Sequence, residues 1–179
     1  MGEYEEMARE ISRSTAAPDS DARFDHWYRR EAPRLRAGLA IASGNADLAA
    51  ECVAEAFARA YAAWPRVESM ESPSGWVFRV AQNELRRRSR RKKREAELLA
   101  SMHGDEGVEA HPADSELWVL VASLPDRMRL VVALRYVADL SEKDVASIMG
   151  ISRGGVSSLL VKARNELARR LGNEVINDG

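Results

Sequence analysis

Apolar side chains recur at every third or fourth position along much of the chain, which is the spacing of amphipathic helices. Phe24, Trp27 and Tyr28 open this pattern, and Leu35 and Leu39 continue it. The clearest stretch runs from Asp47 to Trp64, and its apolar members are Leu48, Cys52, Val53, Ala56, Phe57, Ala60, Tyr61 and Trp64. No stretch of useful length alternates in the manner of a strand, and no segment repeats. The pattern predicts an all-α protein.

Residues that favour turns divide these helices into two groups. Pro65 is expected to end the clearest helix, residues 66–75 form a connection, and another helix begins at about Trp76. Residues 95–115 contain two glycines, one proline and no sustained apolar period, which indicates a flexible linker. We therefore expect two small helical domains. The expected order is a loose polar arm (1–20), a first domain (21–94), the linker (95–115), a second domain (116–172) and a tail (173–179).

Charge is distributed unevenly along the chain, although the formal net charge is only -1. From Arg86 to Arg94 every residue is basic except Ser89. The stretch from Glu95 to Glu116 contains seven acidic residues and no lysine or arginine. A basic run beside an acidic linker is typical of a protein with a nucleic-acid surface.

The stretch of residues 140–171 has the spacing of a helix-turn-helix. Ser141 is a good N-cap, with Asp144 three residues later as a variant of the capping box. Gly150 is expected to end the first helix, because a positive φ is easiest for glycine, and Ser152 caps the second. The side chains expected inside are Val145, Ala146, Ile148, Ile151, Val156, Leu160, Ala163 and Leu167. This motif places the N-terminal end of its second helix in the major groove of DNA.

The outward side of that second helix carries the candidate contacts to duplex DNA. Arginine and lysine suit phosphates or guanine edges, and serine hydroxyls bond to either. The candidates are Arg153, Gly154, Ser157, Ser158, Lys162 and Arg164. The charge at the reading end is light, so we expect a shallow salt dependence and a domain that needs a partner to hold it on DNA. The same spacing is also compatible with a plain helical hairpin inside a bundle.

The helix that enters the basic run carries a second candidate surface. Trp76, Val80 and Leu85 can lie on a core, while the side chains that project from another side are Arg79, Asn83, Arg86, Arg87 and Arg90. Basic and amide groups after a loop that contains Ser74 can hold a backbone and accept an extruded base. The alternative is a solvated basic helix end that complements the helix dipole.

The whole pattern resembles the group 4, extracytoplasmic-function (ECF) sigma factors of bacterial RNA polymerase, within the sigma-70 family. The similar segments are residues 24–35, residues 50–61 (the acidic region 2.2 helix), residues 76–83 (regions 2.3 and 2.4) and, in region 4, Leu124-Pro125, Leu134-Arg135-Tyr136, Leu140-Ser141, Ala146, Gly150-Ile151-Ser152, Gly155-Val156 and Ala163-Arg164. The resemblance covers residues 22–94 and 115–171. The chain departs from the family where basic residues are frequent (Ser157 and Leu159) and where glutamine is common (Ala54).

The resemblance implies a σ2 domain and a σ4 domain joined by a flexible linker. In such a protein the helix 47–64 docks on the β′ clamp of the polymerase core, through Asp47, Glu51, Glu55 and Arg59. The loop 66–75 and the following helix melt and read the −10 element, through Ser74, Trp76, Arg79, Asn83, Arg86, Arg87 and Arg90. The helix from Ser152 reads the −35 element, σ4 meets the β flap, and the acidic linker follows the RNA exit path. The resemblance also implies an anti-sigma factor as partner, with no cofactor.

The residues alone leave three other functional hypotheses to weigh. The first is a stand-alone helix-turn-helix regulator whose residues 22–94 act as a sensor or dimer module. The second is a degenerate sigma-like protein that binds an antagonist but not polymerase. An enzyme is disfavoured, because the histidines and Cys52 stand in unrelated contexts without metal-ligand spacing or a phosphate loop.

The expected location is the cytoplasm. A lone cysteine excludes an internal disulfide framework and fits a reducing compartment. The first 20 residues lack the pattern of a signal peptide, and no apolar stretch approaches the roughly 20 residues that cross a bilayer, so no membrane partner is expected.

Overall fold

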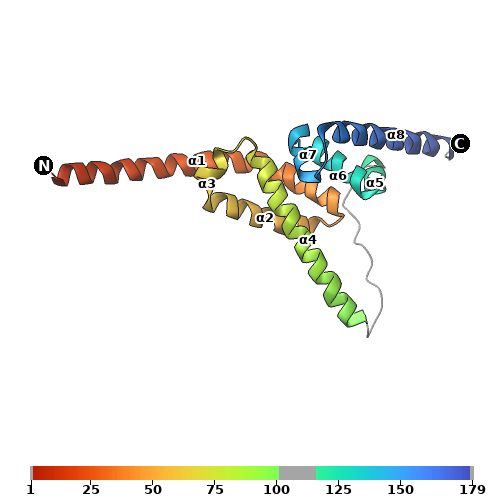
Figure 1. The fold of residues 1–179 in the computed structure, drawn as a ribbon, viewed down its shortest axis with the longest axis horizontal. Coiled ribbons are helices and arrows are strands. Elements are labelled where there is room, and N and C mark those ends of the chain that lie inside the picture. Colours follow the sequence, from red (N-terminus) through yellow and green to blue (C-terminus); the bar gives the residue numbers. More distant parts are fainter. Residues whose placement is uncertain (1, 101–115, 178–179) are drawn as a thin grey trace.

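The computed structural model describes residues 2–100 and 116–177, and the described residues form helices joined by short turns, without a strand. The all-α expectation is confirmed. The described chain divides into a first unit, formed by the helices before residue 101, and a second unit, formed by the helices after residue 115 (Figure 1). Most of the expected linker, residues 101–115, lies outside the described residues, as do His103 and His111.

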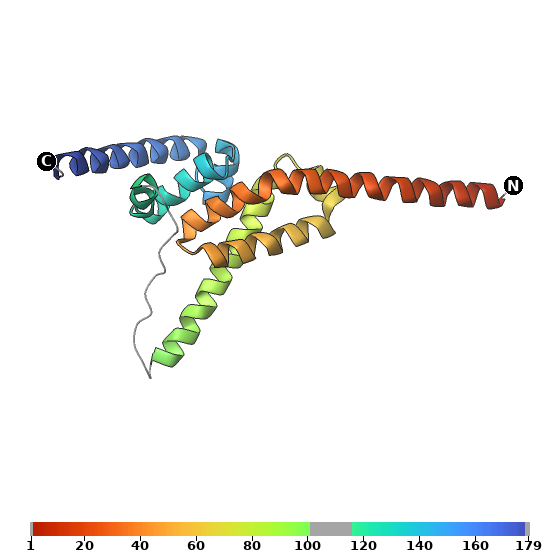
Figure 2. The ribbon, with the colours of Figure 1, turned by 180° about the vertical axis from the view of Figure 1, so that it is seen from behind.

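The first unit contains α1 (Gly2–Ser43), α2 (Ala46–Ala62), α3 (Trp64–Glu68) and α4 (Pro73–Ala100). Helix α2 lies along α1, and α4 crosses both helices before its C-terminal part extends away from the bundle (Figures 1 and 2). Gly44, with φ 72°, makes the tight α1–α2 turn, and the side chain of Asn45 caps α2 by accepting from the Leu48 amide at 2.8 Å.

The start of the chain differs from the sequence-based expectation. Residues 2–20 belong to α1 instead of forming a loose arm. The segment contains many good helix formers (Glu, Ala, Met and Arg), so it can continue a helix that packing fixes further along. Pro33 also lies inside α1 without ending it.

The second helix also ends earlier than its apolar pattern suggested. Helix α2 stops at Ala62, and Trp64 begins the short α3 with Pro65 in its first turn. A proline is favourable in the first turn of a helix, so the same residue closes one helix and opens the next. Trp64 thereby turns into an aromatic cluster with Phe24 and Trp27, at ring-centroid distances of 5.1 and 4.9 Å.

The second unit contains α5 (Glu116–Ala122), α6 (Asp126–Val132), the π-helical turn η1 (Ala133–Val137), α7 (Glu142–Met149) and α8 (Arg153–Asn177). Helix α7, the turn after it and α8 form the expected helix-turn-helix. Ser141 caps α7 by accepting from the Asp144 amide, Gly150 has φ 65°, and Ser152 accepts from the Gly155 amide. Residues 173–177, expected in the tail, continue α8.

The two units share one hydrophobic core. The C-terminal half of α1 packs against η1, and α7 packs against the start of α4. Gly38 permits this approach, because a Cβ there would lie 2.9 Å from the Cβ of Ala138. Sequence periodicity contained no sign of this packing.

Candidate nucleic-acid interface

Helix α4 separates its candidate contacts from its core residues. The side chains of Arg79, Asn83, Arg86, Arg87 and Arg90 are exposed, as the helical spacing predicted. The expected core residues Trp76, Val80 and Leu85 are half-buried against the core, while the fully buried positions are Val77, Phe78 and Ala81. The apolar face of α4 is therefore wider than the sequence suggested.

The buried carboxylate of Glu84 organises the basic run. Its oxygens accept hydrogen bonds from Arg87, at 2.8 and 3.1 Å, and from Arg88, at 2.9 Å. These bonds lower the pKa of Glu84 to about 2. Arg86 forms no ion pair with another residue of the described chain, so its guanidinium remains available for a ligand. The spacing of three and four residues between Glu84 and these arginines is the sequence signal for this cluster.

The residues predicted to dock on polymerase lie on the outer side of α2. Asp47, Glu51 and Arg59 are exposed, and Glu55 is half-buried and pairs with Arg59 at 3.0 Å. Glu51 also pairs with Arg88 of α4 at 2.7 Å. The acidic face of α2 and the basic run of α4 are therefore neighbours, joined by an ion pair.

Residues 69–75, named the α3–α4 corner, comprise the turn after α3 and the first three residues of α4, and the buried carboxylate of Glu31 holds them in place. The Ser74 hydroxyl donates to this carboxylate at 2.5 Å, and Arg34 Nε donates to the same oxygen at 3.0 Å. Burial alone raises the pKa of Glu31, but the hydrogen bonds from Ser74, Arg30 and Arg34 outweigh it and bring the pKa below its ordinary value. Glu31 is fully buried, although nothing in the sequence distinguishes it from an exposed acid.

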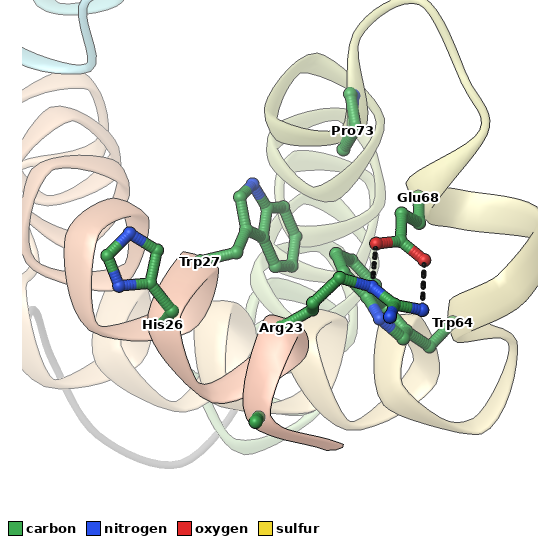
Figure 3. A pocket seen from close by; sticks show the side chains of 7 residues that line it. Arg23, His26, Trp27, Trp64, Glu68 and Pro73 are labelled. Carbon is green, nitrogen blue, oxygen red and sulfur yellow. Dashed lines mark hydrogen bonds and ion pairs between the residues drawn. The ribbon is translucent and has the colours of Figure 1, made fainter. Parts of the chain in front are cut away.

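An open recess of about 460 Å³ lies beside the corner, between α1, α3 and the first residue of α4 (Figure 3). Trp27 and Trp64 form its apolar floor, and Arg23 reaches across Trp64 to donate to Glu68 at 2.7 Å. The indole N–H of Trp64 is buried without a hydrogen-bond partner in the part of the chain that the structure describes. None of the residues predicted to contact DNA lines this recess.

The side of α8 that was predicted to contact DNA faces outward, as the helical spacing predicted. Its inner side buries Val156, Leu160 and Ala163. The exposed positions include Arg153, Gly154, Ser157, Ser158, Lys162 and Arg164. A helix anchored on one side with cationic and hydroxyl groups on the other is suited to enter a DNA groove.

Other kinds of site find little support in the described ranges 2–100 and 116–177. Within them, no group of three or more His, Cys, Asp or Glu side chains is placed to hold a metal ion. Cys52 is buried, and burial raises the pKa of its thiol, which is opposite to what a reactive cysteine needs. No described helix is both long and apolar enough to cross a membrane.

Comparisons with known proteins match both units. The family model Sigma-70 region 2 matches residues 27–95, and Sigma-70, region 4 matches residues 114–167. The ECF RNA polymerase sigma factor SigM of Bacillus subtilis (strain 168) is 30% identical over 140 residues, which cover 73% of this chain and 83% of the relative. SigW, an ECF RNA polymerase sigma factor of the same organism, is 28% identical over 145 residues, 72% of this chain and 78% of the relative.

Solved structures agree over both units. The sigma factor RpoE of Bartonella quintana, solved in complex with the anti-sigma factor NepR, superposes with a TM-score of 0.68 at 25% identity, covering 83% of this chain and 96% of that one. CnrH, solved in complex with the cytosolic domain of CnrY, has a TM-score of 0.56 at 20% identity, covering 89% of this chain and 94% of that one, which is a likeness of fold.

Proposed function

This chain belongs to the extracytoplasmic-function sigma factors of RNA polymerase, within the sigma-70 family, and we propose that it directs core polymerase to promoters through two separate DNA grips. The first unit is the σ2 domain and the second is the σ4 domain. The observation that carries the proposal is the pair of exposed polar faces, one on α4 of σ2 and one on α8 of σ4, each backed by a packed apolar side.

The α4 face is proposed to bind the melted −10 strand. Asn83 supplies an amide for a base edge, and Arg86 supplies a cation for the backbone or a stacked base. Melting requires no covalent catalysis, because captured bases offset the few kcal/mol that unstacking each base costs. Arg87 acts mainly by adding charge near the strand, since Glu84 already fixes its guanidinium.

The α8 face is proposed to read the −35 element as a duplex. Its cations lie at Arg153, Lys162 and Arg164, and each phosphate contact contributes roughly 0.9 to the salt slope. Such a grip is weak alone. Polymerase holds it in place, through the clamp at the α2 face (Asp47, Glu51, Glu55 and Arg59) and through the flap at σ4.

An anti-sigma factor is proposed as the regulatory partner. The Bartonella quintana relative was solved with one, and its likeness to this chain extends over both domains. A protein that covers the α2 face competes directly with polymerase for the same residues.

Run-off transcription with purified core polymerase on a genomic template library tests the function. We expect new start sites that depend on this chain. Binding of duplex DNA by the free chain, without any new start site, would instead favour the stand-alone regulator.

The −10 role is tested by Arg86→Ala, Arg87→Ala and the double variant. The double variant should bind core polymerase normally and lose open-complex formation, with Arg86→Ala responsible for most of the loss. Arg91→Ala is the matched control, because it removes one exposed charge of the same basic run that is paired with Glu95 at 2.7 Å. Permanganate footprints of the double variant that equal those of the wild type would refute the role.

A further inference from the structure

The σ4 domain lies directly on the α3–α4 corner of σ2. Helix α7 of σ4 faces this corner, and Arg79 of α4 donates to the Ser147 hydroxyl at 2.6 Å. Lys143 forms an ion pair with Glu71 in the corner itself. Gly75 lies so close to α7 that an added Cβ would come within 2.9 Å of a carboxylate oxygen of Asp144. The side of σ2 proposed to meet the −10 strand is therefore partly covered.

A third polar contact joins the same domains through α1. Arg34 of α1 donates to Asp139 of σ4 at 3.0 Å and also to the buried carboxylate of Glu31. Glu31 in turn accepts from Ser74, at the start of α4. These successive contacts from Asp139 through Arg34 and Glu31 to Ser74 connect the position of σ4 to the position of the α3–α4 corner. Together, Arg79–Ser147, Lys143–Glu71 and Arg34–Asp139 are called the latch.

The latch is suited to reversible opening. In its two ion pairs, Asp139, Lys143 and Glu71 are more than half exposed to solvent, where single ion pairs are weak and salt-sensitive. The apolar contact beneath it, where Gly38 meets Ala138, favours the closed arrangement by burial. A modest competing interaction is therefore enough to shift such a two-state element.

The geometry points to an autoinhibited free chain: we propose that σ4 covers the α3–α4 corner of σ2 and is held there by the latch. In this state α7 must move away before a promoter strand reaches Arg79. This inference rests on the proposed function, because it concerns access to the same −10 surface. The two uses of Arg79 compete, because its guanidinium, although exposed, already donates to the Ser147 hydroxyl and so has α7 beside it where a DNA strand would bind. Docking on polymerase supplies the competing interactions that separate the domains.

The test uses the full chain and one charge reversal that leaves the proposed DNA contacts intact. Lys143→Glu replaces an attraction to Glu71 with a repulsion. Fluorescence energy transfer between labels on α2 and α8 should fall, and affinity for a labelled oligothymidine strand should rise several-fold. The added negative charge by itself weakens DNA binding, so a rise in affinity reports opening. Arg127→Glu is the matched control, because it makes the same charge change at an exposed residue of α6 outside the latch.

A charge swap provides the second arm. Glu71→Lys combined with Lys143→Glu should restore the energy transfer of the wild type. Distance is the readout here, because lysine at position 71 would itself attract DNA. A cleavable bismaleimide joining cysteines introduced at positions 71 and 143 should abolish strand binding until the link is cut; Cys52 is buried and so is shielded from the reagent.

The outcomes separate the two proposals. Unchanged energy transfer and strand affinity in Lys143→Glu would overturn the latch while leaving transcription by the holoenzyme intact. An open wild-type chain, with low energy transfer equal to that of Lys143→Glu, would overturn it as well. Failure of the wild-type chain to support transcription, with the latch responses as expected, would refute the sigma function and not the domain closure.

Discussion

The Ser74 hydroxyl donates a 2.5 Å hydrogen bond to the fully buried carboxylate of Glu31 and so ties the start of α4 to the middle of α1. Ser74 was a candidate for contact with the −10 strand, and in the structure its side chain is used to hold the corner. Its role toward DNA stays a prediction. The bond indicates that the conformation of the α3–α4 corner is already fixed in the chain without a DNA strand.

Glu31→Gln should lower the free energy of unfolding by about 1–3 kcal/mol, because it weakens the charge-assisted bonds that this buried carboxylate accepts from Ser74, Arg30 and Arg34. Urea unfolding of the free chain measures the change. Asp25→Asn is the matched control, since it makes the same change in α1 at an exposed pair with Arg29 (2.8 Å) and should cost about 0.5 kcal/mol or less. Equal effects of the two variants would show that Glu31 has no special part in the fold.

Glu84→Gln should make the free energy of unfolding depend less steeply on pH under acidic conditions. The pKa of Glu84 is about 2 in the folded chain, below its ordinary 4.5, because Arg87 and Arg88 bond to its charged form. A lowered folded-state pKa stabilises the fold above about pH 4.5, and this contribution disappears as the pH falls toward 2. Denaturant unfolding at steps between these values should therefore show a shallower decline for the variant. An unchanged slope would mean that the cluster adds no stability.

Gly150→Ala and Gly172→Ala should have opposite effects. Gly150 has φ 65° in the turn of the helix-turn-helix, so alanine there should cost about 1–2 kcal/mol through backbone strain alone, because an added Cβ meets no neighbour. Gly172 lies within α8, also with open space around it, and alanine should stabilise by about 0.5–1 kcal/mol. Thermal unfolding compares them, and two changes of the same sign would contradict this account of the turn.

Lys162→Ala should lower the salt dependence of −35 binding by the holoenzyme. Loss of one phosphate contact reduces the slope of log affinity against log salt by roughly 0.9 and weakens binding about equally on different sequences. Arg153→Ala, at the first position of α8, should instead relax sequence preference if it reads a base. Filter binding across a salt series distinguishes these two roles, and an unaltered slope for Lys162→Ala would place that side chain away from the backbone.

The helix-turn-helix was predictable in detail because its signals are local. Ser141, Gly150 and Ser152 act on backbone groups within a few residues, so their spacing alone indicates where each helix ends. The exposed faces of α4 and α8 followed from the helical period for the same reason. The expected loose arm at the start of the chain was wrong, since polar residues with good helix propensity resemble a loose arm until packing extends a helix through them.

The buried carboxylates were harder to foresee. Glu31 and Glu84 look like ordinary solvated acids, and their partners include residues far along the chain, such as Ser74 and Arg59. A charged side chain is buried only where such partners converge, and convergence is a property of the packed bundle.

The sequence by itself determined the helices, their caps, the two matched domains and the residues that face outward, because periodicity and capping operate over a few residues. Only the tertiary structure decided that Arg88 of α4 pairs with Glu51 of α2, because helices far apart in the sequence meet there. It alone also decided that σ4 rests on the α3–α4 corner. Contacts such as Arg34–Asp139 join residues separated by a linker whose composition does not specify how the two domains meet.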